Sequence, residues 1–190
     1  MTTEPRIITI VNNVYFYLVI SLLSLVAIYL SVSILLIPVV ATVFDMIEEK
    51  KDEEFDVYRH FLKKILEKFK LNIKSSKYCI FSVYYFISIY AVSVSTSFAM
   101  MFANIFVSIA LMYIIIVIAD ILTSNETCGI KKVYQTYIFK YTNKQKIDLF
   151  MLVTTFSLLM FFGYIKIFMA SMLLFIYISY NILRKEVHND

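Results

Sequence analysis

Three long apolar runs dominate the chain, and charged segments separate them. The runs cover residues 14–43, 78–121 and 149–183. A bilayer core about 30 Å thick needs roughly 20 apolar residues of helix. The second run is therefore long enough to cross twice, and the third is too long for one helix, so that its first half makes a short span. We expect each of these two runs to fold back as a hairpin, with turns near Ala99–Asn104 and Gly163. The pattern predicts one helix followed by two hairpins.

These runs predict an all-α, polytopic integral membrane protein with about five transmembrane helices in a single membrane domain, 1–190. The expected spans are about 14–37, 78–100, 103–122, 148–162 and 165–183. Pro38 falls where the first run exceeds the length of one span. Because proline interrupts the hydrogen bonds of a helix interior, we expect a spanning helix to about Ile37, then a break, and a continuation that carries Asp45 out of the apolar layer.

Composition and the placement of charge give the orientation. Hydrophobic residues make up 61% of the chain and charged residues 17%, against roughly 45–50% and about 25% in soluble domains. Of 18 lysines and arginines, nine lie in 45–77, five in 123–148 and two after the last run, whereas Arg6 and Lys166 fall on the other side. Because positively charged loops stay cytoplasmic, we expect the N-terminus outside and the C-terminus inside. The net charge of +4 therefore reflects topology, and we expect no nucleic-acid partner.

The first charged segment, about 54–76, predicts a cytoplasmic amphipathic helix. Its apolar residues recur at helical intervals: Phe55, Tyr58, Leu62, Ile65, Phe69 and Ile73. The opposite face holds Lys63, Lys64, Glu67, Lys68, Lys70 and Lys74. We expect this helix to lie along the headgroups or over the ends of the bundle, with its apolar face covered. Segment 130–146 repeats the pattern in a shorter form.

The surface of the first amphipathic segment is the candidate docking face for lipid or for a partner protein. Burying each large apolar side chain contributes about 1.5–3 kcal/mol, and each lysine gains about 1 kcal/mol near anionic headgroups. Membrane lipids are therefore an expected partner. The face comprises Tyr58, Arg59, Phe61, Leu62, Lys63, Lys64, Lys68, Phe69 and Lys70.

The sequence carries no catalytic or metal-binding motif. Its two histidines, His60 and His188, are far apart and lack partner spacing, so we expect no enzyme activity, no metal and no cofactor. Ionisable residues inside apolar runs usually mark transport paths, but Asp45 and Asp120 fall only at the predicted cytoplasmic ends. We interpret both as interfacial anchors. The alternative is a gate, in which Asp120 pairs with a loop lysine and Pro38 or Asp45 takes part.

Two segments resemble a known family. Residues 37–44, with Pro38 near the end of the first run, are followed by an acidic-basic stretch and then by 57–64, where Phe61 and Lys64 fall. In this order they resemble the YesL family of bacterial membrane proteins, whose domain has no assigned function. The resemblance implies a five-helix protein of the bacterial plasma membrane, often associated with carbohydrate uptake systems.

These observations favour a non-enzymatic accessory or assembly subunit of a membrane transporter, with a carbohydrate importer as the class that the resemblance implies. Its partners would be lipids and other membrane subunits, or further copies of the chain. The first alternative is a small autonomous channel or carrier, and the second is a membrane immunity or regulatory protein. Polar residues that converge on an enclosed path would favour the carrier, whereas an exposed apolar groove between the hairpins would favour the subunit.

Overall fold

The chain is helical throughout the part that the structure describes, which confirms the predicted all-α class. The computed structural model describes residues 3–30, 34–49, 57–74, 79–124, 130–161 and 165–184. Its elements are α1 Thr3–Leu30, α2 Leu36–Glu49, α3 Val57–Lys74, α4 Cys79–Val94, α5 Phe98–Thr123, α6 Ile130–Gln135, η2 Thr136–Lys140, α7 Asn143–Phe161 and α8 Ile165–Arg184.

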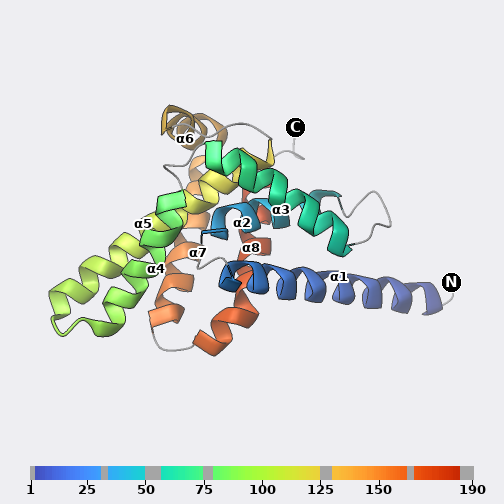
Figure 1. Ribbon diagram of the computed structural model, residues 1–190, viewed down its shortest axis with the longest axis horizontal. Helices are drawn as coiled ribbons and strands as arrows, with labels where there is room; N and C mark the ends of the chain where they lie inside the picture. Colours follow the sequence, from blue (N-terminus) through green and yellow to red (C-terminus); the bar gives the residue numbers. More distant parts are fainter. Residues whose placement is uncertain are drawn as a thin grey trace.

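Helix α2 forms the centre of the molecule. Every residue from Leu36 to Ile47 is buried, and helices α1, α3, α5 and α8 all contact it (Figure 1). A helix that is apolar on all sides needs cover on all sides, and the neighbouring helices provide it. The core therefore surrounds the segment that the sequence predicted as the continuation after the first span.

The break within the first apolar run lies earlier than predicted. Helix α1 ends at Leu30 and α2 begins at Leu36, so Pro38 stands in the first turn of a new helix. Proline is tolerated there because first-turn N–H groups have no partner within the helix. The first bond of the new helix runs from Val39 N–H to the Leu35 carbonyl at 2.8 Å. Pro38 thus helps to begin α2, and α2 holds Asp45 within the packed core.

Helices α4 and α5 form a tight antiparallel hairpin, the first of the two predicted. Its turn lies at residues 95–97, and Asn104 is inside α5. The Ser95 N–H bonds the Val92 carbonyl at 3.3 Å at the start of this turn. Ser88 and Ser108 join the two helices through their hydroxyl groups at 2.7 Å, a contact that small residues permit. The predicted turn was therefore several residues too late.

Helices α7 and α8 form the second hairpin, and Figure 1 shows them side by side. The predicted turn at Gly163 lies outside the described residues. Helix α7 begins at Asn143, just after a reciprocal pair of bonds: Thr142 N–H to Gln145 Oε1 at 2.9 Å and Gln145 N–H to Thr142 Oγ1 at 3.3 Å. This capping box divides the predicted segment 130–146 into α6 with η2 on one side and the start of α7 on the other.

Two helices among the described residues are long and apolar enough to cross a membrane. They are Thr9–Ile28, within α1, and Phe98–Thr123, which is α5. The apolar part of α4, Ile80–Val92, is shorter. Length and composition alone therefore weakly support membrane association, and the five-span topology stays a prediction.

Candidate functional site

Asp45 and Lys68 form a buried ion pair where α2, α3 and α5 meet. The Lys68 ammonium lies 2.8 Å from Asp45 Oδ2, and the two side chains are 1% and 9% exposed. Lys68 also donates to the Leu122 carbonyl at 2.6 Å and to the Thr123 carbonyl at 3.3 Å. Carbonyls in the last turn of a helix lack partners within it, so Lys68 caps α5 while it neutralises Asp45.

Lys64 continues this cluster toward solvent. Its ammonium lies 3.4 Å from Asp45 Oδ2 and also contacts Glu49. His60 Nε2 lies 2.6 Å from the other Glu49 oxygen. The charges of α2 are thus met by a row of side chains on α3, spaced about one helical turn apart.

Three pKa shifts follow from this arrangement. Burial raises the pKa of Asp45, and Lys68 and Lys64 offset only part of that effect. Burial also acts to raise the pKa of Glu49, but hydrogen bonds from Lys64 and His60 outweigh it and lower the pKa below its ordinary value of 4.5. Burial acts to lower the pKa of Lys64, but Glu49 and Asp45 raise it above its ordinary value of 10.5.

Asp120 is the centre of a second cluster at the same end of the molecule. It lies near the end of α5, is 1% exposed and accepts a hydrogen bond from Tyr141 Oη at 2.6 Å. The Lys140 ammonium is 2.5 Å away and Arg184 Nη2 is 3.6 Å away. Burial and the adjacent Asp120 both raise the pKa of the Tyr141 hydroxyl. The pairing of Asp120 with a lysine from the second predicted loop is present, as the gate alternative requires.

Gln145, which the sequence did not single out, joins the start of α7 to the end of α8 in the second hairpin. Its side-chain amide donates to the carbonyls of Ile182 at 3.2 Å and Leu183 at 3.3 Å. Arg184 reaches from α8 toward Thr123 Oγ1, at 3.4 Å, and toward Glu48, at 3.5 Å. We call these residues, with the Asp45 and Asp120 clusters, the polar network. It joins α2, α3, α5, η2, α7 and α8.

The polar network neutralises its buried carboxylates. Asp45 is paired with Lys68, and Asp120 is paired with Lys140 and accepts a hydrogen bond from Tyr141. Within the described residues, no three His, Cys, Asp or Glu side chains are placed to hold a metal ion. These contacts hold the ends of the helices together.

The structure divides the predicted docking face of α3. Tyr58, Arg59, Leu62, Lys63 and Lys70 are exposed, whereas Phe61, Lys64 and Lys68 turn inward and Phe69 lies at the boundary. Tyr58 and Leu62 of the predicted apolar face lie on the exposed side of α3, and the predicted outer face is wrong for Lys64 and Lys68, which turn inward. The physical reason is Asp45: a buried carboxylate requires a cation, and this requirement fixes the rotation of α3.

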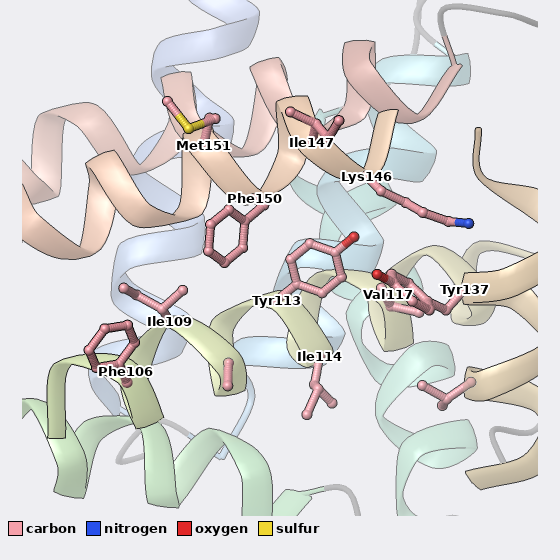
Figure 2. Close-up of a pocket in the computed structure, with 12 residues that line it drawn as sticks. Phe106, Ile109, Tyr113, Ile114, Val117, Tyr137, Lys146, Ile147, Phe150 and Met151 are labelled. Carbon is pink, nitrogen blue, oxygen red and sulfur yellow. The ribbon is translucent and has the colours of Figure 1, made fainter. Parts of the chain in front are cut away.

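An open apolar groove lies between α5 and α7, with α6 and η2 at one end. Its volume is about 780 Å³. Figure 2 shows Phe106, Ile109, Phe150 and Met151 toward one end, and Tyr113, Tyr137 and Lys146 toward the other. The lining residues are Phe106, Ile109, Ala110, Tyr113, Ile114, Val117, Val133, Tyr137, Lys146, Ile147, Phe150 and Met151.

The polar groups of this groove gather at the η2 end. The rings of Tyr113 and Tyr137 meet edge to face with centroids 5.8 Å apart. The Lys146 ammonium lies 5.1 Å from the centre of the Tyr137 ring and donates to the Ile138 carbonyl at 3.3 Å. A second, smaller hollow of about 500 Å³ lies between α1 and α8, around Tyr17 and Tyr177. None of the polar-network carboxylates lines either space.

The chain matches no protein-family model, no curated protein and no solved structure. The resemblance to the YesL family therefore stays a prediction. The class that the structure defines is an all-helical protein with apolar helices suited to a membrane, a polar network at one end and an open apolar groove.

Proposed function

We propose that the protein is a multi-pass, non-enzymatic accessory or assembly subunit of a membrane transport complex. In this proposal, a transmembrane helix of a partner subunit docks in the groove between α5 and α7. The open, apolar character of that groove carries the proposal. Amphipathic or apolar helices commonly bind in grooves of this kind, where side chains one turn apart occupy successive parts of the apolar lining.

The outer surface of the helices supports a bilayer environment. Large apolar side chains are exposed along α1, α4, α5 and α7, including Leu18, Ile87, Phe98 and Phe150. Soluble monomers rarely expose contiguous apolar patches of this extent. We propose that α1, α4, α5, α7 and α8 span the membrane, which gives the five spans that the sequence predicts.

The positions of the helix ends support the proposed orientation. The last turn of α5, the first turn of α7 and the last turn of α8 all meet in the polar network through Asp120, Gln145 and Arg184. Two membrane hairpins with their turns outside, joined to each other by a cytoplasmic connection from α5 to α7, bring these three ends together. The network would then lie at the cytoplasmic face, with the N-terminus of α1 outside.

Contacts within the network favour a subunit over an autonomous carrier. The most deeply buried charges are paired, Asp45 with Lys68 and Asp120 with Lys140, and none of the three buried groups lines the groove. A carrier needs polar groups that converge on its substrate path. The alternative of a gate rests on the Asp120–Lys140 pair, and flux measured in liposomes that contain the purified protein alone would support it.

Filling the groove tests the proposal. Ala110 lines it, whereas Ala103 is exposed on the same helix and lies outside it. Ala110→Trp should remove a partner that copurifies at fixed stoichiometry in mild detergent, and Ala103→Trp should retain it. Carbohydrate importers, which the YesL resemblance implies, are the first complexes to examine. Retention of the same partner by Ala110→Trp would contradict docking in the groove.

A further inference from the structure

The outer face of α3 carries a line of exposed apolar side chains. Tyr58, Leu62 and Leu66 are 48%, 56% and 57% exposed. Residues four apart lie one above another on a helix, so the three form a single stripe that we call the outer stripe. Phe61 and Ile65, which are buried, form the adjacent inward line.

Basic residues border the outer stripe on the side away from the core. With 3.6 residues per turn, Lys63 and Lys70 follow Leu66 around the helix, and Glu67 comes after them. Lys63, Lys70 and Glu67 are all exposed. The order around α3 is therefore core, apolar, basic and acidic. The same order of environments is met on passing from a protein core through the acyl boundary and the phosphates into water.

The inward contacts of α3 prevent the outer stripe from being buried by rotation. Lys68 reaches Asp45 and the end of α5, and Lys64 reaches Asp45 and Glu49, all on the opposite side of the helix. Rotation of α3 toward the core would withdraw Lys68 from a buried carboxylate. The stripe therefore stays on the outer side of the described helices.

We infer that the outer face of α3 binds the anionic surface of the lipid bilayer. The outer stripe enters the boundary between headgroups and acyl chains, and Lys63 and Lys70 meet the lipid phosphates. Charge complementarity identifies this occupant, because an anionic leaflet supplies apolar cover and negative charge in the order that α3 presents them. This inference goes beyond the proposed function, since it requires no partner in the groove between α5 and α7.

Spin labels on the full chain in lipid nanodiscs test this inference. A nitroxide is attached at Leu66→Cys or Glu67→Cys, in a background without Cys79 and Cys128. The nanodiscs contain phosphatidylcholine alone or phosphatidylcholine with phosphatidylglycerol. In the mixed membrane the label at 66 should be relaxed by oxygen, which concentrates in lipid, and the label at 67 by a water-soluble nickel complex. Equal access of the nickel complex to both positions would overturn the inference.

A matched pair of double variants separates charge from simple burial. Lys63→Gln with Lys70→Gln removes two basic groups beside the stripe, and Lys131→Gln with Lys144→Gln removes two exposed basic groups elsewhere. The first pair should lower the equilibrium constant for the lipid-embedded state at 66 roughly 30-fold in the mixed membrane, and the second pair should leave it unchanged. Protection at 66 only in cells, but in neither nanodisc, would assign the stripe to a protein partner and would refute the lipid inference.

Discussion

At the scale of single residues, compensation of buried charge explains the most informative contacts. Asp45 and Asp120 are almost fully buried, and each is met by cations from helices far along the chain. Removing one member of such a pair leaves its partner charged in a medium that solvates it poorly. The sequence showed both aspartates at the ends of apolar runs and offered a loop lysine as a partner for Asp120. It could not predict that Lys68 pairs with Asp45, because pairing depends on tertiary distance and not on spacing.

Replacement of Lys68 by methionine should destabilise the protein strongly. The variant leaves Asp45 unpaired and the Leu122 carbonyl without its donor. Loss of one partner of a buried pair costs about 3–5 kcal/mol, which a large fall in the unfolding temperature in detergent would reveal. Adding Asp45→Asn should recover part of the loss. Lys63→Met, on the exposed side of α3, serves as the control and should change stability little.

The pH dependence of stability should reveal the pairing of Glu49 with Lys64 and His60. Because the pKa of Glu49 is lowered on folding, its stabilising contribution is present above the ordinary pKa of 4.5 and is lost as the pH falls through the lowered value. The raised pKa of Asp45 has the opposite effect on stability, because protonation of Asp45 as the pH falls favours the folded state.

Comparison of variants isolates the Glu49 contribution. Below about pH 4.5, the wild type should lose stability more steeply than Glu49→Gln, in thermal unfolding measured at a series of pH values. Glu67→Gln makes the same change of charge on the exposed side of α3 and should follow the wild type. Parallel curves for the wild type and Glu49→Gln would show that this carboxylate makes no net stabilising contact.

At the scale of helices, the spacing of apolar residues along the chain predicted the features that depend on neighbouring residues. Apolar runs, hairpins and the helix of α3 follow from length and periodicity, and the structure shows them. The rotation of α3 was wrong because its apolar and basic residues support two orientations, and only the buried Asp45 distinguishes them. The start of α7 could have been found, since Thr142-x-x-Gln145 is a recognisable capping box.

The groove also left a trace in the sequence of α5. Phe106, Ile109, Tyr113 and Val117 recur at intervals of three or four residues, which places them along one side of that helix. In an apolar helix this pattern does not stand out from its surroundings. The opposing wall, from α7, depends on how the two hairpins pack, and the sequence alone could not supply it.

The role of Pro38 can be tested by moving the proline. In the first turn of α2, Pro38→Ala should leave helical content unchanged and alter stability by only about 1 kcal/mol. Ala41→Pro places the ring in the helix interior and should cost about 3 kcal/mol or more. Circular dichroism and thermal unfolding measure both effects. A clear gain of helical content in Pro38→Ala would instead support the predicted kink within one continuous helix.

At the scale of the whole molecule, orientation in the membrane is the property to measure. Thr96 lies in the turn between α4 and α5, and Asn143 lies at the start of α7; both are exposed. Single cysteines at these positions, in a background without Cys79 and Cys128, should differ in their reaction with an impermeant thiol reagent. Thr96→Cys should react in intact cells, and Asn143→Cys only after permeabilisation. Reaction of Asn143→Cys from outside would contradict the proposed topology.

The contacts of Lys68 also impose an order on synthesis. The carbonyls that it caps belong to Leu122 and Thr123, which lie 54 and 55 residues further along the chain. Asp120 in turn requires Lys140, Tyr141 and finally Arg184. During synthesis, each of these polar groups thus lacks its partner until a later helix has been made. A chain truncated before α5 would therefore leave Lys68 without these carbonyls, and one truncated before α8 would leave Asp120 without Arg184.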